Sequence, residues 1–329
     1  MDPAEPTPPP PAPASVFARL RASPVTFALL AVNVGAFLWV WRHGGAADMG
    51  TLLRYGANEP LHVWAGEYWR VASYMFLHGG WLHLAMNTYV SVGWSTSLER
   101  ALRKKRFLFV YFASGIAGGC ASVVSSWIFG PHLSVGASGA LFGIIGAVLA
   151  LRRRQLGSFA AFFADKGIRS LLLQIGIWTA IGLTPALHLD NAAHFGGLLT
   201  GFAATWLLTS PTPRSGWLAF AAAFGALFIV AARPWWTPEG KDANRLLAFA
   251  RGYATGKAVD ENGALRPWPL DVARAERFLA KGCAHGLGSA CAMLADEIEL
   301  TGAPDAPARA DALRRRACDV DPGSCRQIH

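Results

Sequence analysis

Four hydrogen-bonding side chains lie within long apolar stretches of this sequence. Ser138 occurs in GASG, His194 in NAAHFGG, and His83 and Asn87 in HLAMN. Polar groups are costly in apolar surroundings, so such residues are candidates for a functional site. A serine hydroxyl that meets an imidazole can act as a nucleophile beside a base, and further hydrogen-bond donors can stabilise developing negative charge. These residue types could therefore support nucleophilic catalysis.

Each of the four residues alone has a simpler explanation. A single serine in a membrane helix usually hydrogen-bonds to a carbonyl of its own backbone, and a single histidine usually packs between helices. The functional interpretation gains weight only if all four side chains lie at similar depths on neighbouring helices. The elements that carry them therefore decide between the two explanations.

The composition indicates a membrane protein. The chain has 329 residues, of which 53% are hydrophobic and 16% are charged, and its mean hydropathy is +0.29. So few charges cannot cover the surface of a water-soluble protein of this length, which makes the lipid bilayer its natural surrounding. The net charge of +9 could indicate nucleic acid binding. Because Lys and Arg gather in short segments between apolar runs, we expect no nucleic acid partner.

Seven apolar segments are long enough, or nearly so, to cross about 30 Å of hydrocarbon. They are 24–41, 71–98, 107–129, 136–151, 168–187, 192–208 and 217–232. Basic residues precede the first segment and follow the second and the fourth, which places those loops in the cytoplasm. The N-terminus is then cytoplasmic, and the residues after the seventh segment lie on the outer side of the membrane.

Helix geometry predicts that Ser138 and His194 lie at the same depth in the membrane. The segments that carry His83, Ser138 and His194 all run from the outside to the inside, and Ser138 and His194 each lie about two residues into their segments. A rise of 1.5 Å per residue puts both side chains a few ångströms below the outer surface. His83 and Asn87 are one helical turn apart and share a face of their helix.

Small residues in the same segments predict close helix packing. The fourth segment contains Gly139 and Gly143, and the sixth contains Gly197 and Gly201 at a GxxxG spacing. GxxxG alone indicates no more than packing between helices. Here such packing is what a serine and a histidine on different helices need in order to meet.

Together these motifs resemble the rhomboid family. The matches are EYWR at 67–70, HGGWLHLAMN at 78–87, GASG at 136–139 and AHFGGLLTG at 193–201, in the family order. They cover roughly residues 20–210. The resemblance implies an all-α membrane bundle with six core helices, and an intramembrane serine endopeptidase that uses neither a cofactor nor a metal. Its expected substrates are single-span membrane proteins, cleaved near the outer membrane boundary.

The family pattern also implies a role for each site residue. Ser138 would attack the scissile carbonyl, and His194 would accept the serine proton and return it to the leaving amine. His83, Asn87 and the backbone N–H of Ser138 would form the oxyanion hole. The supporting residues in the same motifs are Gly136, Phe142, Gly197, Gly201, Trp69 and Arg70.

Two supporting residues adjoin the serine, and one acid adjoins the histidine. Gly136 would permit close backbone approach, and Phe142, four residues after Ser138, would stack on the histidine. Asp190 lies one helical turn before His194. We assign no triad, because an acid at the start of a helix is favoured by the helix dipole and helps to cap the helix. The resemblance likewise implies a Ser–His dyad.

Two other functions fit a chain of this kind. A catalytically inactive rhomboid-like membrane chaperone or substrate-binding factor would share the fold. Such proteins typically lack the serine, the histidine or the spacing around them, and this chain retains all three. A transporter or channel would also carry polar residues in the membrane, but we find no clear inverted repeats, and the four residues lie near one surface instead of the midplane.

The two ends of the chain differ from the apolar core. The N-terminal segment is rich in proline, lacks the apolar region of a signal peptide and is expected to be disordered. In the C-terminal third, two similar segments have their first cysteines, Cys283 and Cys318, 35 residues apart. This period resembles Sel1-like, tetratricopeptide-related helical repeats. On the outer side, disulfides could join Cys283 to Cys291 and Cys318 to Cys325; the alternative is four free thiols in a cytoplasmic repeat.

The predicted organisation has four parts. They are a proline-rich tail at 1–15, a six-helix rhomboid-like core at 16–210, a seventh span at 211–236 and a soluble repeat domain at 237–329. The composition, rich in Ala, Arg and Gly, suggests a bacterium of high GC content and hence the inner membrane; an organellar membrane is the alternative.

Overall fold

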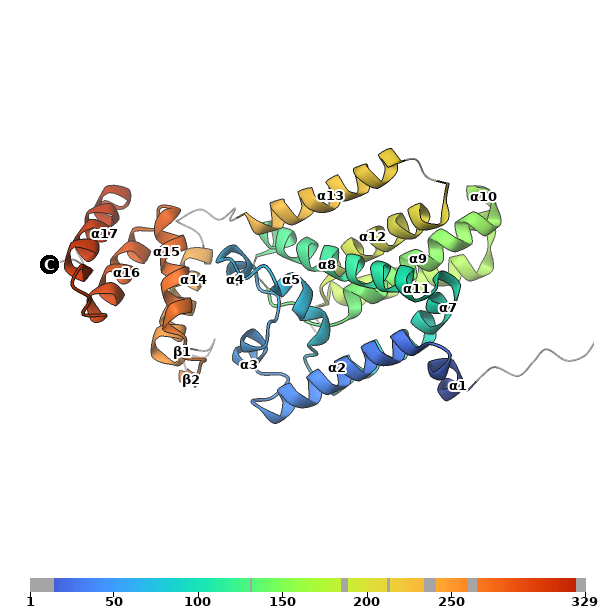
Figure 1. Ribbon diagram of the computed structural model, residues 1–329, viewed down its shortest axis with the longest axis horizontal. Coiled ribbons are helices and arrows are strands. Elements are labelled where there is room, and N and C mark those ends of the chain that lie inside the picture. The colour runs from blue at the N-terminus through green and yellow to red at the C-terminus, as the bar shows by residue number, and fades with distance from the viewer. Residues whose placement is uncertain are drawn as a thin grey trace, which may run out of the picture.

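The long helices form a bundle, and a smaller group of helices lies at one end of it (Figure 1). The computed structural model describes residues 15–130, 132–184, 189–211, 214–233, 241–259 and 265–323. The predicted disorder of the proline-rich tail falls on residues outside these ranges. The bundle is entirely helical over the residues described, as the sequence predicts.

The long elements of the bundle follow the predicted apolar segments. They are α2 (Pro24–Arg42), α6 (Trp81–Val90) with its continuation through the π-helical turn η2 (Ser91–Ser95) into α7 (Thr96–Leu102), α8 (Lys104–Phe129), α9 (Ser138–Leu156), α11 (Lys166–Gly182), α12 (Asn191–Thr209) and α13 (Arg214–Ala232). The short elements are α1 (Val16–Arg21), α3 (Met49–Arg54), α4 (Pro60–Trp64), α5 (Arg70–Ser73), the 3-10 turn η1 (Tyr74–Phe76) and α10 (Phe159–Ala164).

One predicted segment is wrong in its first third. The sequence predicts a continuous span over 71–98, but the long helix begins only at Trp81. The preceding residues form α5 and η1, and the chain is extended at Leu77. Gly80 has φ +151°, a value that residues with a side chain rarely adopt, so a helix cannot pass through this point. The apolar pattern does not reveal this break.

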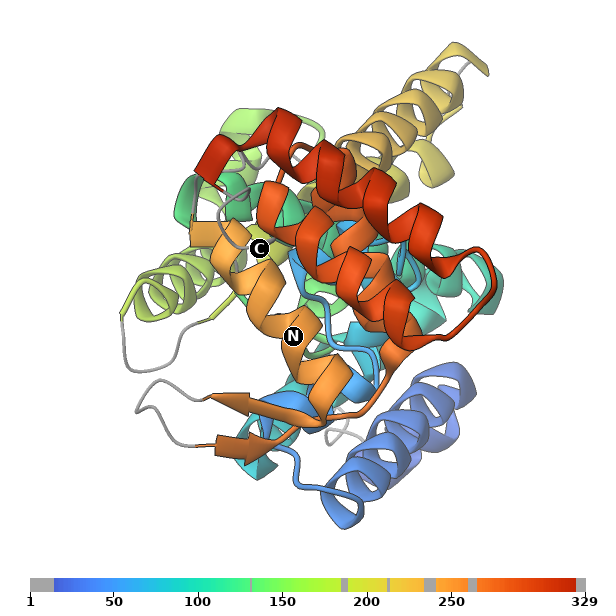
Figure 2. The same ribbon diagram turned by 90° about the vertical axis from the view of Figure 1, so that its left-hand side faces the viewer.

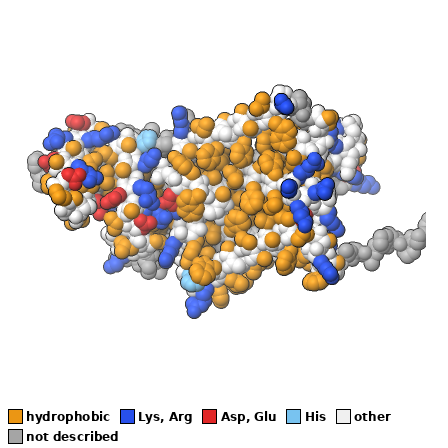
Figure 3. Space-filling model, in the orientation of Figure 1, with side chains coloured by type: hydrophobic (Ala, Val, Ile, Leu, Met, Phe, Trp, Pro, Cys, Tyr) orange, Lys and Arg blue, Asp and Glu red, His pale blue; other side chains and the backbone are white. Residues whose placement is uncertain are grey.

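A broad apolar surface surrounds the bundle. Among the described residues, three helices are long and apolar enough to cross a membrane by length and composition, namely α2, the part of α8 from 104 to 126, and α13. Apolar side chains cover the middle of the molecule, and charged side chains gather at its two ends (Figure 3). Water would not favour an apolar surface of this extent, whereas lipid does. The protein is therefore a membrane protein.

The bundle is built around close packing of α9 against α12. A Cβ atom on Gly197 would collide with the carbonyl oxygen of Gly139, and one on Gly201 would collide with the carbonyl oxygen of Gly143. The two backbones are thus in direct contact at two levels, as the GxxxG spacing predicts. This contact fixes the distance between the start of α9 and the first turn of α12.

The C-terminal domain (residues 241–323) is a row of helices with one small hairpin. Its elements are α14 (Lys241–Thr255), the antiparallel strands β1 (Lys257–Val259) and β2 (Leu265–Pro267), α15 (Val272–Ala284), α16 (Gly288–Leu300) and α17 (Ala306–Val320). Successive helices pack side by side in chain order (Figure 2). The hairpin is a departure from the predicted all-α chain. It follows Gly256, whose φ of +69° ends α14 and turns the chain into β1.

A disulfide links two neighbouring helices of this domain. It joins Cys283, near the end of α15, to Cys291 in α16. Cys318 is also disulfide-bonded, while its predicted partner Cys325 lies outside the described residues. Disulfides persist in oxidising compartments, which is the environment expected on the outer side of the membrane.

The segment between α2 and α6, residues 43–80, lies between the bundle and the C-terminal domain (Figure 1). We refer to it as the first loop. It contains α3, α4, α5 and η1, and its buried side chains include both apolar and charged residues. The first loop therefore contacts both the helices of the candidate site and the C-terminal domain.

Candidate active site

Ser138 and His194 are hydrogen-bonded to each other. Ser138 Oγ lies 2.9 Å from His194 Nε2. Ser138 is the first residue of α9, and His194 lies in the first turn of α12. The glycine contacts between these helices bring both helix starts together, and His194 is only 5% exposed. The two helices thus place a partly buried serine hydroxyl against a buried imidazole.

The segment before α9 has a conformation that favours glycine. Gly136 has φ +122°, and its N–H donates a hydrogen bond to the carbonyl oxygen of Tyr74 at 2.9 Å. A Cβ atom on Gly136 would lie 2.6 Å from His83 Nε2 and 3.8 Å from Ser138 Oγ. The absence of a side chain at Gly136 therefore lets the imidazole of His83 approach the serine.

Phe142 lies against the imidazole of His194. Their ring centroids are 4.1 Å apart and their planes differ by 4°. Phe142 is one helical turn after Ser138 and so points to the same side of α9. A stacked ring restricts rotation of the imidazole and keeps Nε2 directed at the serine hydroxyl.

Asp190 caps α12 and does not bind the imidazole of His194. Its Oδ1 accepts a hydrogen bond from the N–H of Ala193 at 2.9 Å, as expected of an acid at a helix start. Its Oδ2 lies 3.6 Å from His132 Nε2. Nδ1 of His194 has no hydrogen-bond partner among the residues described. This geometry favours a dyad over a triad.

Asn87 is buried beside the site but is not joined to Ser138. Its Nδ2 donates to the carbonyl oxygen of His83 at 2.9 Å, and its Oδ1 has no partner in the described part of the chain. Asn87 lines a small cavity whose wall includes Asn33 and Ala137, the residue directly before the serine. Of the predicted oxyanion residues, His83 therefore lies next to Gly136, close to Ser138. The Asn87 amide points along its own helix to the carbonyl oxygen of His83.

Two buried residues near the site were not singled out by the sequence analysis. Tyr74 donates its hydroxyl to the carbonyl oxygen of Gly115 at 2.8 Å and fits against Gly139, so it sets the spacing of α8 and α9. His78 is 2% exposed, and its ring centroid is 5.2 Å from that of His83. The position of His78 in HGGWLHLAMN could have identified it in the sequence, because a histidine in an apolar stretch is energetically costly.

Trp69 and Arg70 lie in the first loop, where Arg70 joins separate parts of that loop. Arg70 is completely buried, and its NH1 donates to the carbonyl oxygens of Leu53 and Ala57 at 2.8 Å each. Trp69 is 49% exposed, and its ring centroid is 4.8 Å from the guanidinium carbon of Arg70. Their described contacts organise the first loop and do not include Ser138 or His194.

Acidic, histidine and cysteine side chains do not form a metal site in the described residues: no group of three or more could hold an ion. The residues gathered at the site offer a hydroxyl, imidazoles, an amide and backbone N–H groups.

Comparison with known proteins identifies the family. A model of the Rhomboid domain matches residues 65–211, a range that contains every site residue described above except Asn33. YdcA of Bacillus subtilis is 31% identical over 202 residues, which cover 59% of this chain and 94% of that protein. This chain belongs to the rhomboid family.

Two other rhomboid relatives are matched over only part of their length. The rhomboid protease GluP of Bacillus subtilis is 33% identical over 186 residues, which cover 56% of this chain and 35% of GluP. The mitochondrial RHOMBOID-like protein 6 of Arabidopsis thaliana is 38% identical over 173 residues, which cover 52% of this chain and 53% of that protein. The rhomboid thus spans about a third to a half of the length of these two curated relatives. Its α13 and C-terminal domain follow the matched Rhomboid domain.

Proposed function

We propose that this rhomboid is an intramembrane serine endopeptidase that cleaves membrane proteins with a Ser138–His194 dyad. The observation that carries the proposal is the 2.9 Å hydrogen bond between Ser138 Oγ and His194 Nε2. His194 is buried, and Phe142 holds its imidazole by stacking. Retention of both residues in contact favours a protease over an inactive rhomboid-like chaperone or substrate-binding factor.

The dyad would act through an acyl-enzyme. Ser138 Oγ attacks the scissile carbonyl carbon while its proton passes to His194 Nε2. The tetrahedral intermediate collapses as His194 protonates the leaving amine, which breaks the C–N bond and leaves an ester on Ser138. His194 then deprotonates a water molecule, which attacks the ester carbonyl carbon. The bond from that carbon to Ser138 Oγ breaks, the proton on His194 returns to Oγ, and the carboxyl product is released. No cofactor takes part in these steps.

Hydrogen-bond donors near His83 would stabilise the negative charge on the tetrahedral intermediate. The backbone N–H of Ser138 stands at the exposed start of α9, where N–H groups have no partner within the helix. Nε2 of His83 lies beside Gly136, so an N–H on that nitrogen would add a second donor. Reorientation of the Asn87 amide, which now donates to the carbonyl oxygen of His83, would add a third. Each such donor is worth roughly 3–4 kcal/mol of the activation barrier.

The positions of the elements support an orientation for the protein in the membrane. The C-terminal domain lies at the end of the bundle opposite α1, α7 and α10 (Figure 1). Basic side chains gather at that opposite end (Figure 3), and the positive-inside rule makes it cytoplasmic. With seven predicted spans, we propose that the C-terminal domain lies outside the cytoplasm, in bacteria on the outer face of the inner membrane. Substrates would be single-span proteins cleaved near that face.

The C-terminal domain supports a second, structural proposal. Its helices α14 to α17 pack in chain order, and its described disulfide lies between two of them. We infer a Sel1-like, tetratricopeptide-related domain that follows the protease core. In such repeats each helix pair contacts mainly its neighbours along the chain.

The experiment for the protease proposal uses purified protein in liposomes with a fluorescent single-span substrate. Wild-type protein should release a product cut within or next to the transmembrane segment. Ser138→Ala and His194→Ala should each lower the rate by at least about 10⁴-fold. Equal rates for wild type and Ser138→Ala would refute the proposal and would favour the chaperone alternative.

A further inference from the structure

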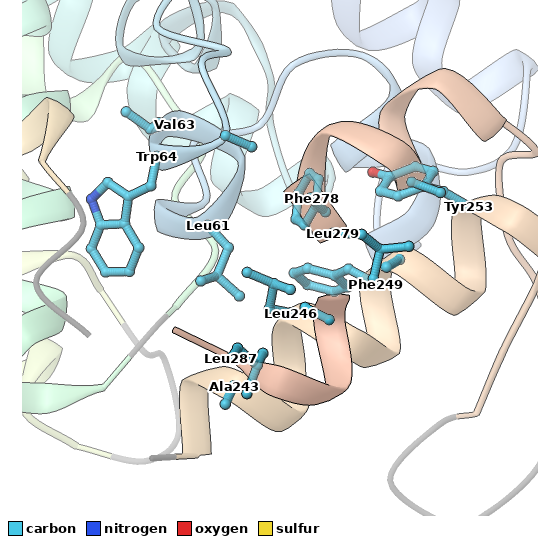
Figure 4. Close-up of a cluster of buried hydrophobic side chains, with 14 of the residues drawn as sticks. Leu61, Val63, Trp64, Ala243, Leu246, Phe249, Tyr253, Phe278, Leu279 and Leu287 are labelled. Carbon is cyan, nitrogen blue, oxygen red and sulfur yellow. The ribbon is translucent and has the colours of Figure 1, made fainter. Parts of the chain in front are cut away.

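The first loop and the C-terminal domain share one hydrophobic core. Leu61 of α4 packs with Leu246 and Phe249 of α14 and with Phe278 of α15 (Figure 4), and all four are buried. Leu61 is 185 residues from Leu246 and 217 residues from Phe278 in sequence. The domain is therefore packed against the first loop as one folded unit with it.

A chain of buried ion pairs continues this contact. Arg274 of α15 donates from Nε to Oε1 of Glu67 at 2.7 Å, and Oε2 of the same carboxylate accepts from Arg70 Nε at 2.7 Å. Exposed fractions of the three side chains are 14%, 7% and 0%. Although burial opposes ionisation, the positive charges of Arg70 and Arg274 hold the pKa of Glu67 below its ordinary value. Glu67 is thus an anion bound by Arg70 from the first loop and by Arg274 from α15, with Arg277 of α15 a further 3.5 Å contact to Oε1.

Arg70 connects the Glu67 ion pair to the backbone of the first loop. Its NH1 group binds the carbonyl oxygens of both Leu53 and Ala57, which places the end of α3 and the following turn. Because the guanidinium is planar, a shift of the Glu67 carboxylate that turns Arg70 would alter both hydrogen bonds. The position of Ala57 fixes that of Asn58, the next residue.

Asn58 connects the first loop to the segment before the serine. Asn58 and Ser134 exchange two backbone hydrogen bonds, of 3.0 Å and 2.8 Å. The Asn58 side chain also donates to the carbonyl oxygen of Gly119 in α8 at 2.9 Å. Ser134 is two residues before Gly136 and four before Ser138. A continuous set of contacts therefore leads from the C-terminal domain to the segment before the nucleophile.

We propose that Arg274 is a positioning residue: through Glu67, Arg70 and the Asn58–Ser134 bridge it holds the segment that carries Ser138 in its reactive geometry. The inference rests on the proposed protease function. The C-terminal domain is then a part of the catalytic apparatus of this rhomboid and not an independent appendage. Substrate need not touch the domain for the domain to influence the rate.

The test compares variants of the full-length protein. Arg274→Gln removes the charge and the bond to Glu67, whereas Arg274→Lys restores the charge without the planar fork. The matched control is Arg314→Gln, because Arg314 forms ion pairs with Glu299 and Asp296, which belong to the same domain and are remote from the first loop. The substrate should be a single-span peptide with only a few residues outside the membrane, so that it cannot reach the C-terminal domain.

The expected result is a change in kcat. Because a displacement of about 1 Å at a reacting group can cost about 100-fold, Arg274→Gln should lower kcat by about 10- to 100-fold and leave KM within about twofold. Arg274→Lys should recover part of the loss, and Arg314→Gln should match wild type. Hydrogen exchange should accelerate in Arg274→Gln at residues 53–58 and 132–137 and stay unchanged in the control.

Each outcome has a distinct meaning. If wild-type protein cleaves and Arg274→Gln cleaves equally fast, the inference is wrong while the proposed function stands. A rise in KM with unchanged kcat would make the domain a substrate-binding element and would also overturn the inference. If wild-type protein does not cleave at all, the proposed function fails; unchanged exchange at residues 53–58 and 132–137 would then reject the structural coupling as well.

Discussion

The dyad and the first-loop interface both bring polar side chains together inside the protein, but different interactions hold them in place. Ser138 and His194 meet because two helix backbones touch at glycines, and a single neutral hydrogen bond joins them. The first loop and the C-terminal domain meet through a hydrophobic core and charged pairs centred on Glu67. In lipid the hydrophobic effect does not drive helices together, so steric fit between α9 and α12 must position the dyad. At the first-loop interface, which is exposed to water when the parts are separated, the hydrophobic effect drives burial and the charged pairs determine the orientation. Steric changes should therefore disrupt the dyad, and changes of pH or charge should disrupt the first-loop interface.

The largest effect should come from filling the helix contact. Gly201→Val would push side-chain atoms into the backbone of Gly143, which cannot move aside, so we expect at least about 3 kcal/mol of destabilisation. Proteolysis should fall by more than about 100-fold, because α9 and α12 separate. Thermal unfolding in detergent and cleavage assays check both. The control is Gly225→Val in α13, where a Cβ meets no neighbouring atom. Equal behaviour of the two variants would show that shape does not position the dyad.

A smaller effect should follow when the stacked ring is lost. Phe142→Leu removes the flat surface against His194, and an aromatic pair is worth about 0.5–1.5 kcal/mol. We expect kcat to fall by up to about tenfold with little change in stability. Phe142→Tyr keeps the ring and should retain most activity. Steady-state kinetics of both variants would test this, and a Leu variant as active as wild type would count against orientation by stacking.

Acid should loosen the interface and leave the helix contact intact. Burial lowers the pKa of His62, which is hydrogen-bonded to Glu59 and to Tyr253, so His62 is neutral in the docked state. A histidine with a lowered pKa binds protons more readily when the interface is open or unfolded than when it is formed. Its contribution to the stability of the interface is therefore complete above about pH 6.5 and declines as the pH falls. The lowered pKa of Glu67 adds a further loss below about pH 4.5.

Thermal unfolding followed by tryptophan fluorescence at pH 7.5 and pH 5 measures this effect. We expect a lower midpoint at pH 5, by about 4–8 °C for each 1 kcal/mol lost from a domain of this size. His62→Gln cannot be protonated and should flatten the dependence between the two pH values. A midpoint that rises on acidification would contradict the assigned neutral state of His62.

The smallest effect concerns Asp190. Asn also caps helices well, so Asp190→Asn should keep the bond to the N–H of Ala193 and most of the activity, within about threefold. Asp190→Ala should lose about 0.5–2 kcal/mol of stability without the loss of catalysis that Ser138→Ala produces. Cleavage rates of the two variants decide the matter. Loss of activity in Asp190→Asn comparable to that of Ser138→Ala would establish a triad.

The sequence predicted the helix pair that carries the dyad better than the loop that supports it. Ser138 and His194 could be placed at one level because helix rise converts residue offsets into depth, and the glycines at 139, 143, 197 and 201 marked the surfaces that touch. Such information is local to each helix. The direction of the Asn87 amide was not predicted, although it is local: the amide donates to the carbonyl oxygen of His83 one turn earlier in the same helix.

The first loop could not be predicted for the same reason. The sequence identified Arg70 only as a supporting motif residue. Its burial depends on Glu67, which is itself paired with Arg274, 204 residues further along the chain than Arg70. The contact between His62 and Tyr253 spans 191 residues. No periodic pattern encodes pairings at such separations. The start of the helix at Trp81 was missed because it depends on the backbone angle of Gly80, and apolarity does not report that angle.

The reactivity of Ser138 tests the central claim most directly. Purified protein in detergent should be treated with a fluorophosphonate, digested and analysed by mass spectrometry. A serine activated by His194 should carry the phosphonyl group at Ser138 in wild type, and His194→Ala should abolish the adduct although Ser138 is still present. Absence of any adduct on Ser138 in folded wild-type protein, or equal labelling in His194→Ala, would contradict the dyad.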